Sequence, residues 1–191
     1  MAQTASNVTA AKPKVAGAIN VAPVGTTLPT DAVTALAEAF KGLGYVDENG
    51  LVNSGVFSPE GIKAWGKDTV LTLDNGDGET YKFKLIEATN VEVLKFVFGE
   101  NKVTGTLETG IKIEKGDYSR PEQVLVVDMI LRDNALKRIV VPKAIITSVS
   151  DIVYKDNDVV GYEVTIKANK DSNDRSSYEY IKATGATGAT G

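Results

Sequence analysis

A short apolar helix predicted at residues 87–99, EATNVEVLKFVFG, constrains the fold of this chain more than any other stretch. Thr89 and Glu92 have the spacing of a capping box, in which each side chain bonds a free backbone N–H at the helix start, and Gly99 is placed to end the helix. Nearly the whole circumference between them is apolar, and a helix this short is marginal on its own, so it must be buried against other elements. The side chains expected in this core are Val91, Val93, Leu94, Phe96, Val97 and Phe98.

Polar and apolar residues alternate on both sides of this helix, and the pattern predicts roughly eight β-strands. Hairpins are expected at residues 69–88, around the turn Asn75–Gly78, and at residues 144–168, around Lys155–Asp158. Residues 123–131, QVLVVDMIL, are almost continuously apolar, so this strand should be covered on both faces. The other predicted elements are strands at 15–24, 43–52, 105–115 and 178–182, and a short amphipathic helix at 30–42. Residues 137–141 either extend the hairpin at 144–168 or form a strand of their own, broken at Pro142.

These elements predict a mainly β (α+β) fold, an antiparallel β-sandwich or barrel with one buried flanking helix. We expect it to occupy residues 15–169 as one domain, since 191 residues suffice for a single core of this kind. Residues 1–14 are small and polar and predict a flexible N-terminal arm. Residues 170–191 predict a polar C-terminal extension that ends in a repeated Ala-Thr-Gly tail.

A long irregular segment interrupts the predicted strands at residues 53–67, NSGVFSPEGIKAWGK. No period of a helix or a strand holds there, and long loops inside compact domains are more often functional than not. The segment nevertheless carries four large apolar side chains, which need a surface to contact. It either folds back over its own core or docks on another subunit. The four side chains are Val56, Phe57, Ile62 and Trp65.

The chain contains no histidine and no cysteine, which excludes several classes of active site. Ser-His-Asp and Cys-His catalysis, histidine-ligated zinc and thiolate metal sites all need these residues. The acidic turn Asp74–Glu79 lacks the ligand spacing of an EF-hand loop, so we expect no metal ion and no cofactor. Carboxylate, lysine or tyrosine chemistry stays open. A net charge of −4 argues against a domain that grips nucleic acid.

The N-terminal residues lack the apolar stretch of a signal peptide, and no apolar run approaches the ~18 residues of a membrane span. We therefore expect a soluble chain that is made in the cytoplasm and has no membrane contact.

A series of short motifs occurs in a fixed order between Val15 and Leu51: Gly17, Ala22–Pro23, Gly25–Thr27, Leu28–Thr30 and Leu43–Tyr45. Further along, the strand YKFKLIEATN runs directly into VEVLKFVFG. The order of the motifs resembles the start of major tail tube proteins of long-tailed (siphovirus-type) bacteriophages, especially phages of actinobacteria, and the later stretch resembles a strand-to-helix joint of that family. The motifs are individually short, and the resemblance lies in their order.

This resemblance implies a non-enzymatic structural protein of the virion tail, with a tail-tube-like fold, made in the host cytoplasm. Copies of the chain would form hexameric rings that stack into a tube, through which genomic DNA passes without specific binding. Residues 53–67 correspond by position to the loop that reaches the neighbouring ring, so Val56, Phe57, Ile62 and Trp65 are the expected stacking residues. The other implied partners are tape-measure, tail terminator and distal tail proteins. Tube proteins of contractile systems share the fold, but the N-terminal motifs favour a non-contractile tail.

Two other functional classes compete with this interpretation. A carbohydrate-binding or adhesin-type β-sandwich would present exposed aromatic side chains, and saturable glycan binding by a monomer would favour it. An enzyme that uses two carboxylates, such as a glycosidase, would lose its activity on a single Asp or Glu substitution. The candidate aromatic residues of the binding module are Trp65, Tyr118, Tyr154 and Tyr178.

Overall fold

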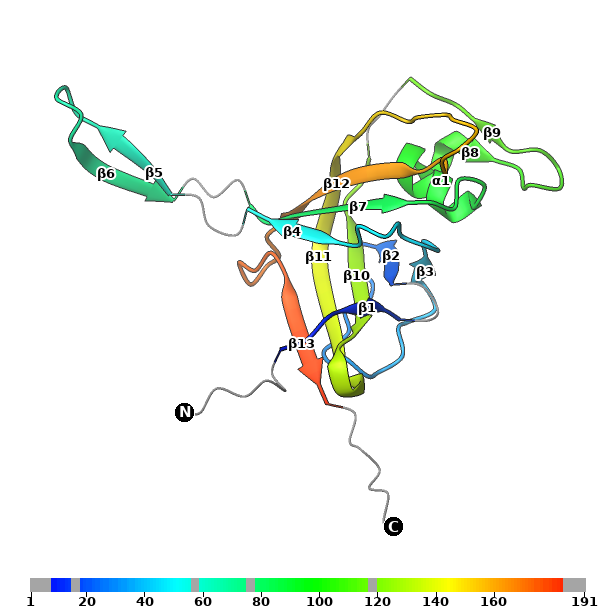
Figure 1. Ribbon diagram of the computed structural model, residues 1–191, viewed down its shortest axis with the longest axis horizontal. Coiled ribbons are helices and arrows are strands. Elements are labelled where there is room, and N and C mark those ends of the chain that lie inside the picture. The colour runs from blue at the N-terminus through cyan, green and yellow to red at the C-terminus, as the bar shows by residue number, and fades with distance from the viewer. Residues whose placement is uncertain (1–7, 15–17, 56–58, 75–77, 117–119, 184–191) are drawn as a thin grey trace, which may run out of the picture.

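The computed structural model describes residues 8–14, 18–55, 59–74, 78–116 and 120–183 (Figure 1). At its centre is a long antiparallel hairpin of β10 (Gln123–Ile130) and β11 (Leu136–Val149), joined by the 3₁₀ turn η3 (Arg132–Asn134). On one side β10 pairs with β2 (Ile19–Pro23), and on the other β11 pairs with β12 (Tyr162–Asn169). The hairpin is therefore the middle of a larger sheet.

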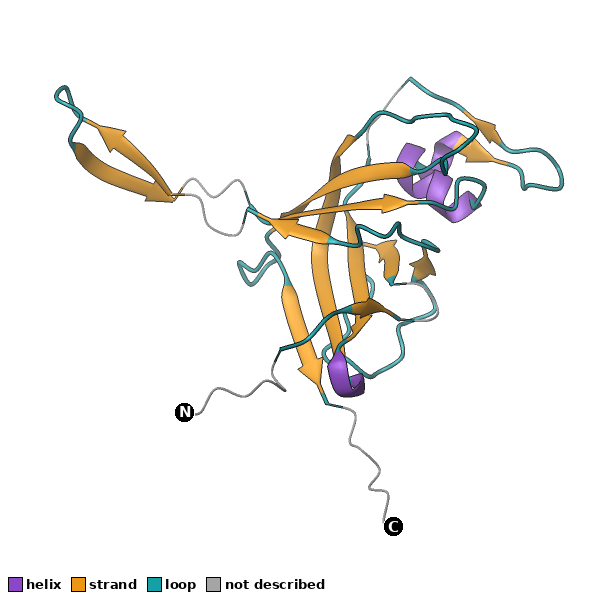
Figure 2. Ribbon diagram, in the orientation of Figure 1, coloured by secondary structure: helices purple, strands orange, loops and turns teal. Residues whose placement is uncertain are grey.

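The sheet runs in the order β3–β2–β10–β11–β12–β7–β4, and every pair in it is antiparallel. β1 adds to the end of β10, and β13 adds to the first half of β11 (Figure 2). The predicted antiparallel, mainly β fold with one flanking helix is thereby confirmed. The bounds not yet given are β1 Lys12–Pro13, β3 Lys41–Gly42, β4 Val52–Ser54, β7 Thr80–Leu85 and β13 Tyr178–Lys182.

Residues 41–47 close this sheet into a barrel. At the start of the segment β3 pairs with β2, and the Leu43 N–H donates to the Ile19 carbonyl at 2.9 Å. At its end Val46 forms a bridge with Leu85 of β7. The same stretch of chain thus bonds to the second strand of the sheet, β2, and to the second-last, β7, and the apolar residues inside are enclosed.

The helix α1 (Val91–Phe98) lies at one end of the barrel (Figure 1). Its side chains at Val93, Leu94, Phe96, Val97 and Phe98 are buried in the main core, and Val91 is half-buried at the edge of that core. The ring of Phe98 packs edge-on against Tyr162 of β12, with 5.5 Å between the ring centroids. After α1 come η2 (Glu100–Lys102) and a small hairpin of β8 (Val103–Thr104) and β9 (Lys112–Ile113).

The predicted cap of this helix was wrong by one residue. Asn90 is the N-cap, because its Oδ1 accepts the Glu92 N–H at 3.0 Å, whereas Thr89 is exposed and precedes the helix. Gly99 ends the helix with a positive φ of 107°, and its N–H donates to the Lys95 carbonyl at 2.8 Å.

The second face of the β10–β11 hairpin has its own small core. Val124, Val126 and Val140 are buried there, and Leu28, Leu36 and Phe40 of the segment after β2 pack onto them. The prediction that residues 123–131 are covered on both faces is confirmed for the strand β10, since Leu125 and Val127 belong to the main core.

The helix predicted at residues 30–42 is absent, and the segment crosses this face as turns and bends. Asp31 Oδ1 accepts the N–H groups of Val33 and Thr34, at 2.8 and 2.6 Å. The carbonyls of Asp31 and Thr34 accept the guanidinium of Arg138, at 3.1 and 2.8 Å. Backbone carbonyls that a helix would use internally are therefore taken by the sheet beneath.

Strand pairing also differs from the predictions at three places. β6 (Thr69–Asp74) pairs with β5 (Pro59–Lys63) and not with β7, so the hairpin predicted at 69–88 was wrong. Only Lys112–Ile113 of the predicted strand 105–115 forms a strand. The predicted break at Pro142 was wrong as well, because β11 runs through it where the register with β10 shifts between Gln123 and Leu125. A bulge accommodates a residue that has no N–H to donate.

Candidate interaction surface

The β5–β6 hairpin stands away from the barrel at the end opposite to α1 (Figure 1). Within the described residues, its strands pair with each other and with no strand of the barrel. The Ala64 N–H donates to the Asp68 carbonyl at 2.8 Å and the Lys67 N–H to the Ala64 carbonyl at 2.9 Å. Gly66 and Lys67 both have positive φ, which a tight turn requires. The hairpin is thus a regular element, although the sequence of residues 53–67 shows no period of a helix or a strand.

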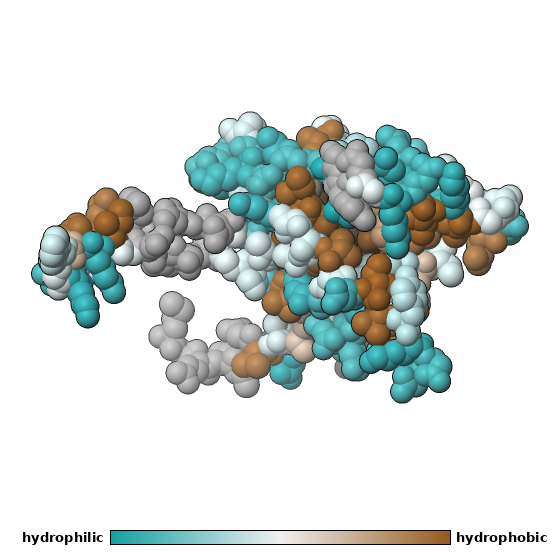
Figure 3. Space-filling model, turned by 90° about the horizontal axis from the view of Figure 1, so that it is seen from above, coloured by the Kyte–Doolittle hydropathy of each residue, from teal (hydrophilic) through white to brown (hydrophobic). Residues whose placement is uncertain are grey.

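Apolar side chains of this hairpin are exposed. Ile62 and Leu71 lie directly opposite each other in the register and so share one face, and they are 43% and 51% exposed. Val70 is 63% exposed, and Trp65 in the turn is fully exposed. A two-stranded hairpin is at best marginally stable in water alone, so a contact that covers these side chains would stabilise it. Figure 3 shows hydrophobic surface on the hairpin as well as on the body of the molecule.

Of the four residues predicted to contact another subunit, the structure places Ile62 on β5 and Trp65 in the following turn. Val56 and Phe57 lie outside the described residues. The sequence did not single out Val70 and Leu71 as contact residues, because they were assigned to a strand of the barrel. The signal that could have found them is the missing alternation in TVLTLD, where Val70 and Leu71 are adjacent.

The two legs of the hairpin leave the barrel side by side at Gly55 and Gly78. Both have positive φ, 81° and 82°, and a Cβ on Gly55 would lie 2.7 Å from the Gly78 carbonyl oxygen. Only glycine fits so close an approach in this conformation.

A buried carboxylate joins three elements at this root. Glu79 accepts hydrogen bonds from Tyr81 Oη at 2.6 Å and from Asn53 Nδ2 of β4 at 2.8 Å. The hydroxyls of Ser176 and Ser177, just before β13, donate to its second oxygen at 2.9 and 2.6 Å. Burial raises the pKa of Glu79. The four hydrogen bonds, led by the one from Ser177, lower the pKa by more than burial raises it, so that the pKa lies below the usual 4.5. Burial, followed by the contact with Glu79, raises the pKa of Tyr81.

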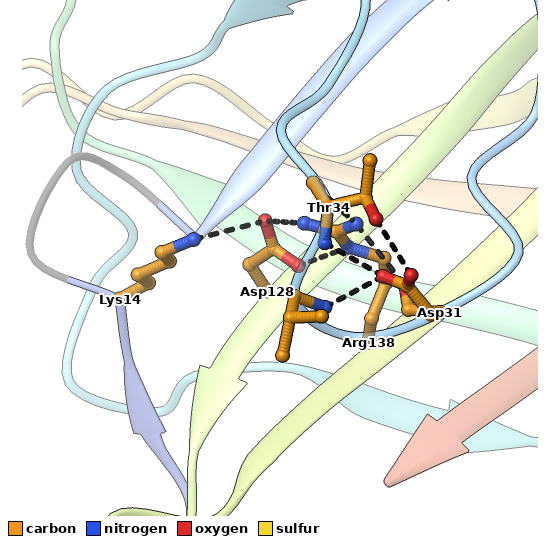
Figure 4. A network of polar contacts seen from close by, with 6 residues as sticks. Lys14, Asp31, Thr34, Asp128 and Arg138 are labelled. Carbon is orange, nitrogen blue, oxygen red and sulfur yellow. Dashed lines mark hydrogen bonds and ion pairs between the residues drawn. The ribbon is translucent and has the colours of Figure 1, made fainter. Parts of the chain in front are cut away.

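A second polar network holds the segment after β2 against the β10–β11 hairpin (Figure 4). Arg138 of β11 and Asp128 of β10 are cross-strand neighbours and are almost fully buried. They form a two-pronged ion pair, Nε to Oδ1 at 2.6 Å and Nη2 to Oδ2 at 3.0 Å, and Lys14 Nζ lies 4.0 Å from Oδ2. Hydrogen bonds from the Thr34 hydroxyl and N–H and from the Val33 N–H lower the pKa of Asp31 to about 2. The sequence analysis did not identify this pair, although Asp128 is the single charged residue within the apolar strand β10.

The aromatic residues considered for a binding platform lie on separate elements. Trp65 is in the β5–β6 turn, Tyr154 is exposed in the β11–β12 connection, and Tyr178 of β13 donates to Asp171 Oδ2 at 2.6 Å. Tyr118 lies outside the described residues. Within the described ranges, no three Asp or Glu side chains gather as ligands for a metal ion. None of the helices in the described part of the chain is long and apolar enough to cross a membrane.

Comparison with known proteins gives one family. A family model described as phage tail tube protein matches residues 1–190, so the match includes the barrel and the β5–β6 hairpin alike. No curated protein matches the chain.

Proposed function

The chain belongs to the phage tail tube protein family, and from this premise we propose that its copies assemble into hexameric rings that stack into a tail tube. The tube is the conduit through which the genomic DNA leaves the capsid. A tail tube is a structural part of the virion, which supports our proposal that the protein acts by assembly and not by catalysis. We place it in the tail of a long-tailed, non-contractile phage, after synthesis in the host cytoplasm.

The observation that carries this proposal is the β5–β6 hairpin. It projects from the barrel and exposes Ile62, Trp65, Val70 and Leu71. Large exposed apolar groups on a projecting element favour a protein partner. In a stack of identical rings that partner is a second copy of the chain, which makes the hairpin the contact between rings. Val56 and Phe57 belong to the same proposed contact.

The charge of the chain suits a conduit for DNA. A net charge of −4 per subunit keeps a polyanion from adhering to the tube, so DNA slides past without specific binding. The further partners in this proposal are the tape-measure, tail terminator and distal tail proteins, which set the length and the ends of the tube.

Electron microscopy of the purified protein tests this proposal directly. Negatively stained samples over a wide concentration range, with sedimentation of the same samples, are expected to show rings and hollow tubes with six subunits per ring. A particle that stays monomeric at every concentration, also after addition of the tail terminator and tape-measure proteins, would contradict it. Saturable glycan binding by that monomer would then establish the binding module in its place.

A further inference from the structure

We propose that Glu79 couples the C-terminal strand β13 to the root of the β5–β6 hairpin, so that the strand and the root open and close as one cooperative unit. The root consists of residues 53–55 and 78–81, where the two legs of the hairpin leave β4 and β7. The coupling lies within one subunit. It therefore goes beyond the proposed assembly and does not depend on it.

β13 and β4 are both weakly held strands at the margin of the sheet. Among the described strands, β13 pairs with β11 alone, and β4, which is three residues long, pairs with β7 alone. Every residue of β4 is exposed, and so are Glu179, Ile181 and Lys182 of β13. Strands with few buried contacts open more readily than the core of a sheet. Side-chain contacts at their ends therefore matter for both strands.

The Glu79 carboxylate contacts both strands, one with each oxygen. Oε1 accepts from Asn53 Nδ2 of β4 at 2.8 Å and from Tyr81 Oη of β7 at 2.6 Å. Oε2 accepts from the hydroxyls of Ser176 and Ser177 at 2.9 and 2.6 Å, and these two serines directly precede β13. A single side chain thus connects the root of the hairpin to the start of the C-terminal strand.

Burial of this carboxylate is the physical cause of the coupling. Glu79 is 9% exposed, and its backbone carbonyl accepts the Ala168 N–H of β12 at 2.8 Å, so the residue is held against the sheet. When β13 separates from β11 and takes Ser176 and Ser177 with it, Oε2 loses both of these donors. A buried charged oxygen without donors is unfavourable, so the root must open to let water reach it. Coupling is reciprocal, so a contact that holds the root also holds β13.

The two legs of the hairpin are also fixed to each other at the root. Ser54 lies opposite Thr80 in the register of β4 and β7, and Thr80 Oγ1 donates to the Ser54 carbonyl at 3.3 Å. A Cβ on Gly55 would lie 2.7 Å from the Gly78 carbonyl oxygen. A change at Glu79 therefore reaches both legs.

Hydrogen exchange of backbone amides, read by mass spectrometry on subunits below the concentration at which they sediment as rings or tubes, tests this coupling. Glu179→Gly/Ile181→Gly weakens β13 at two exposed positions away from Glu79, because glycine disfavours a strand and the 2.7 Å ion pair of Lys137 with Glu179 is lost. Amides of β13 should exchange about tenfold faster. If the two are coupled, amides of β4 and of the start of β7 should accelerate by the same factor.

The same glycine pair is then introduced into the background Ser176→Ala/Ser177→Ala, which lacks the hydroxyls that Glu79 accepts from. There it should accelerate exchange in β13 and leave the root at the rate of its own background, since only linked sites depart from additivity. The matched control Lys112→Gly/Glu114→Gly also removes an exposed ion pair and adds two glycines, at and directly after β9. It should change exchange in neither β13 nor the root.

Three results would overturn the proposal. The root may keep its exchange rate when the glycine pair accelerates β13, or it may accelerate equally in both backgrounds. It may also respond to the β9 control, which would make the effect a general loss of stability. None of these results depends on whether copies of the chain form tubes, so a failure of the coupling is distinct from a failure of the proposed function.

Discussion

Asp128 and Arg138 carry opposite charges and are buried between the β10–β11 hairpin and the segment after β2 that covers it. Removing two charges from water costs several kcal/mol per ion, and the two-pronged contact at 2.6 and 3.0 Å offsets this cost. Arg138 also satisfies the carbonyls of Asp31 and Thr34, so this one side chain ties the segment after β2 to the sheet.

Removing one partner of this pair is expected to be severe. Arg138→Met leaves the buried Asp128 without its principal partner and should lower the free energy of unfolding by about 3–5 kcal/mol, measured by urea denaturation. The double variant Asp128→Leu/Arg138→Met removes both charges and should recover part of this loss. A loss below about 1 kcal/mol in the single variant would show that the pair is unimportant for stability.

The carboxylate of Glu79 makes stability depend on pH in a predictable direction. Its folded-state pKa is lowered below 4.5, so its contribution is complete above pH 4.5 and is lost as the pH falls through the folded-state pKa. Glu79→Gln should lower the free energy of unfolding at neutral pH by about 1–3 kcal/mol, because a buried charged acceptor is lost.

Urea denaturation at several pH values checks this prediction. The difference between the original chain and Glu79→Gln should shrink below pH 4.5. The control is Glu163→Gln, a more exposed carboxylate that accepts from Ser150 and Lys82, and its effect at neutral pH should be smaller. If the difference in the free energy of unfolding between the original chain and Glu79→Gln stays constant down to acid pH, the ionised carboxylate is not its cause.

Among the elements, the start of α1 is where the sequence pattern and the structure give different capping residues, Thr89 and Asn90. Asn90→Ala should destabilise the protein by about 1 kcal/mol, because the Glu92 N–H loses its acceptor. Thr89→Ala is the matched control and should cost only a few tenths of a kcal/mol, since Thr89 is exposed outside the helix. Thermal unfolding of the two variants gives the comparison, and the reverse order would restore Thr89 as the cap.

Elements with a strong local pattern could be predicted from the sequence. β10 is apolar throughout, β12 alternates cleanly with Tyr162, Val164 and Ile166 inward, and α1 has apolar residues between readable ends. For each of these elements, the local sequence alone predicts whether it is a helix or a strand and which face is buried.

The pairing of the strands, and the segment that covers the second face of the β10–β11 hairpin, could not be predicted in the same way, because they depend on residues far along the chain. β7 finds β12 rather than β6, although the turn Asn75–Gly78 indicates a local hairpin. Residues 30–42 have helix-like spacing, but Arg138, about a hundred residues later, bonds their carbonyls. Of the candidate contact surface, the sequence indicated Ile62 and Trp65, whereas their place on a separate hairpin follows from the β5–β6 register.

For the molecule as a whole, the proposed contact between rings gives a test by substitution. Trp65→Asp places a charge at the tip of the hairpin and should raise the concentration at which tubes appear by about tenfold or more, because burying an unpaired carboxylate opposes association. The subunit should remain folded, since Trp65 is fully exposed. Sedimentation and thermal unfolding measure the two effects.

The control for this substitution keeps the apolar character of the side chain. Trp65→Phe should assemble nearly as well as the original chain. Normal tubes from Trp65→Asp would remove the hairpin tip from the contact.

In the proposed assembly, closure of the barrel by residues 41–47 would protect subunits that accumulate before a tail begins to grow. β2 and β7 each have a strand on both sides, so their backbone groups offer no template for stray chains. Folded subunits at high concentration would therefore not aggregate through these strands, and tube growth would depend on the proposed contact of the hairpin alone.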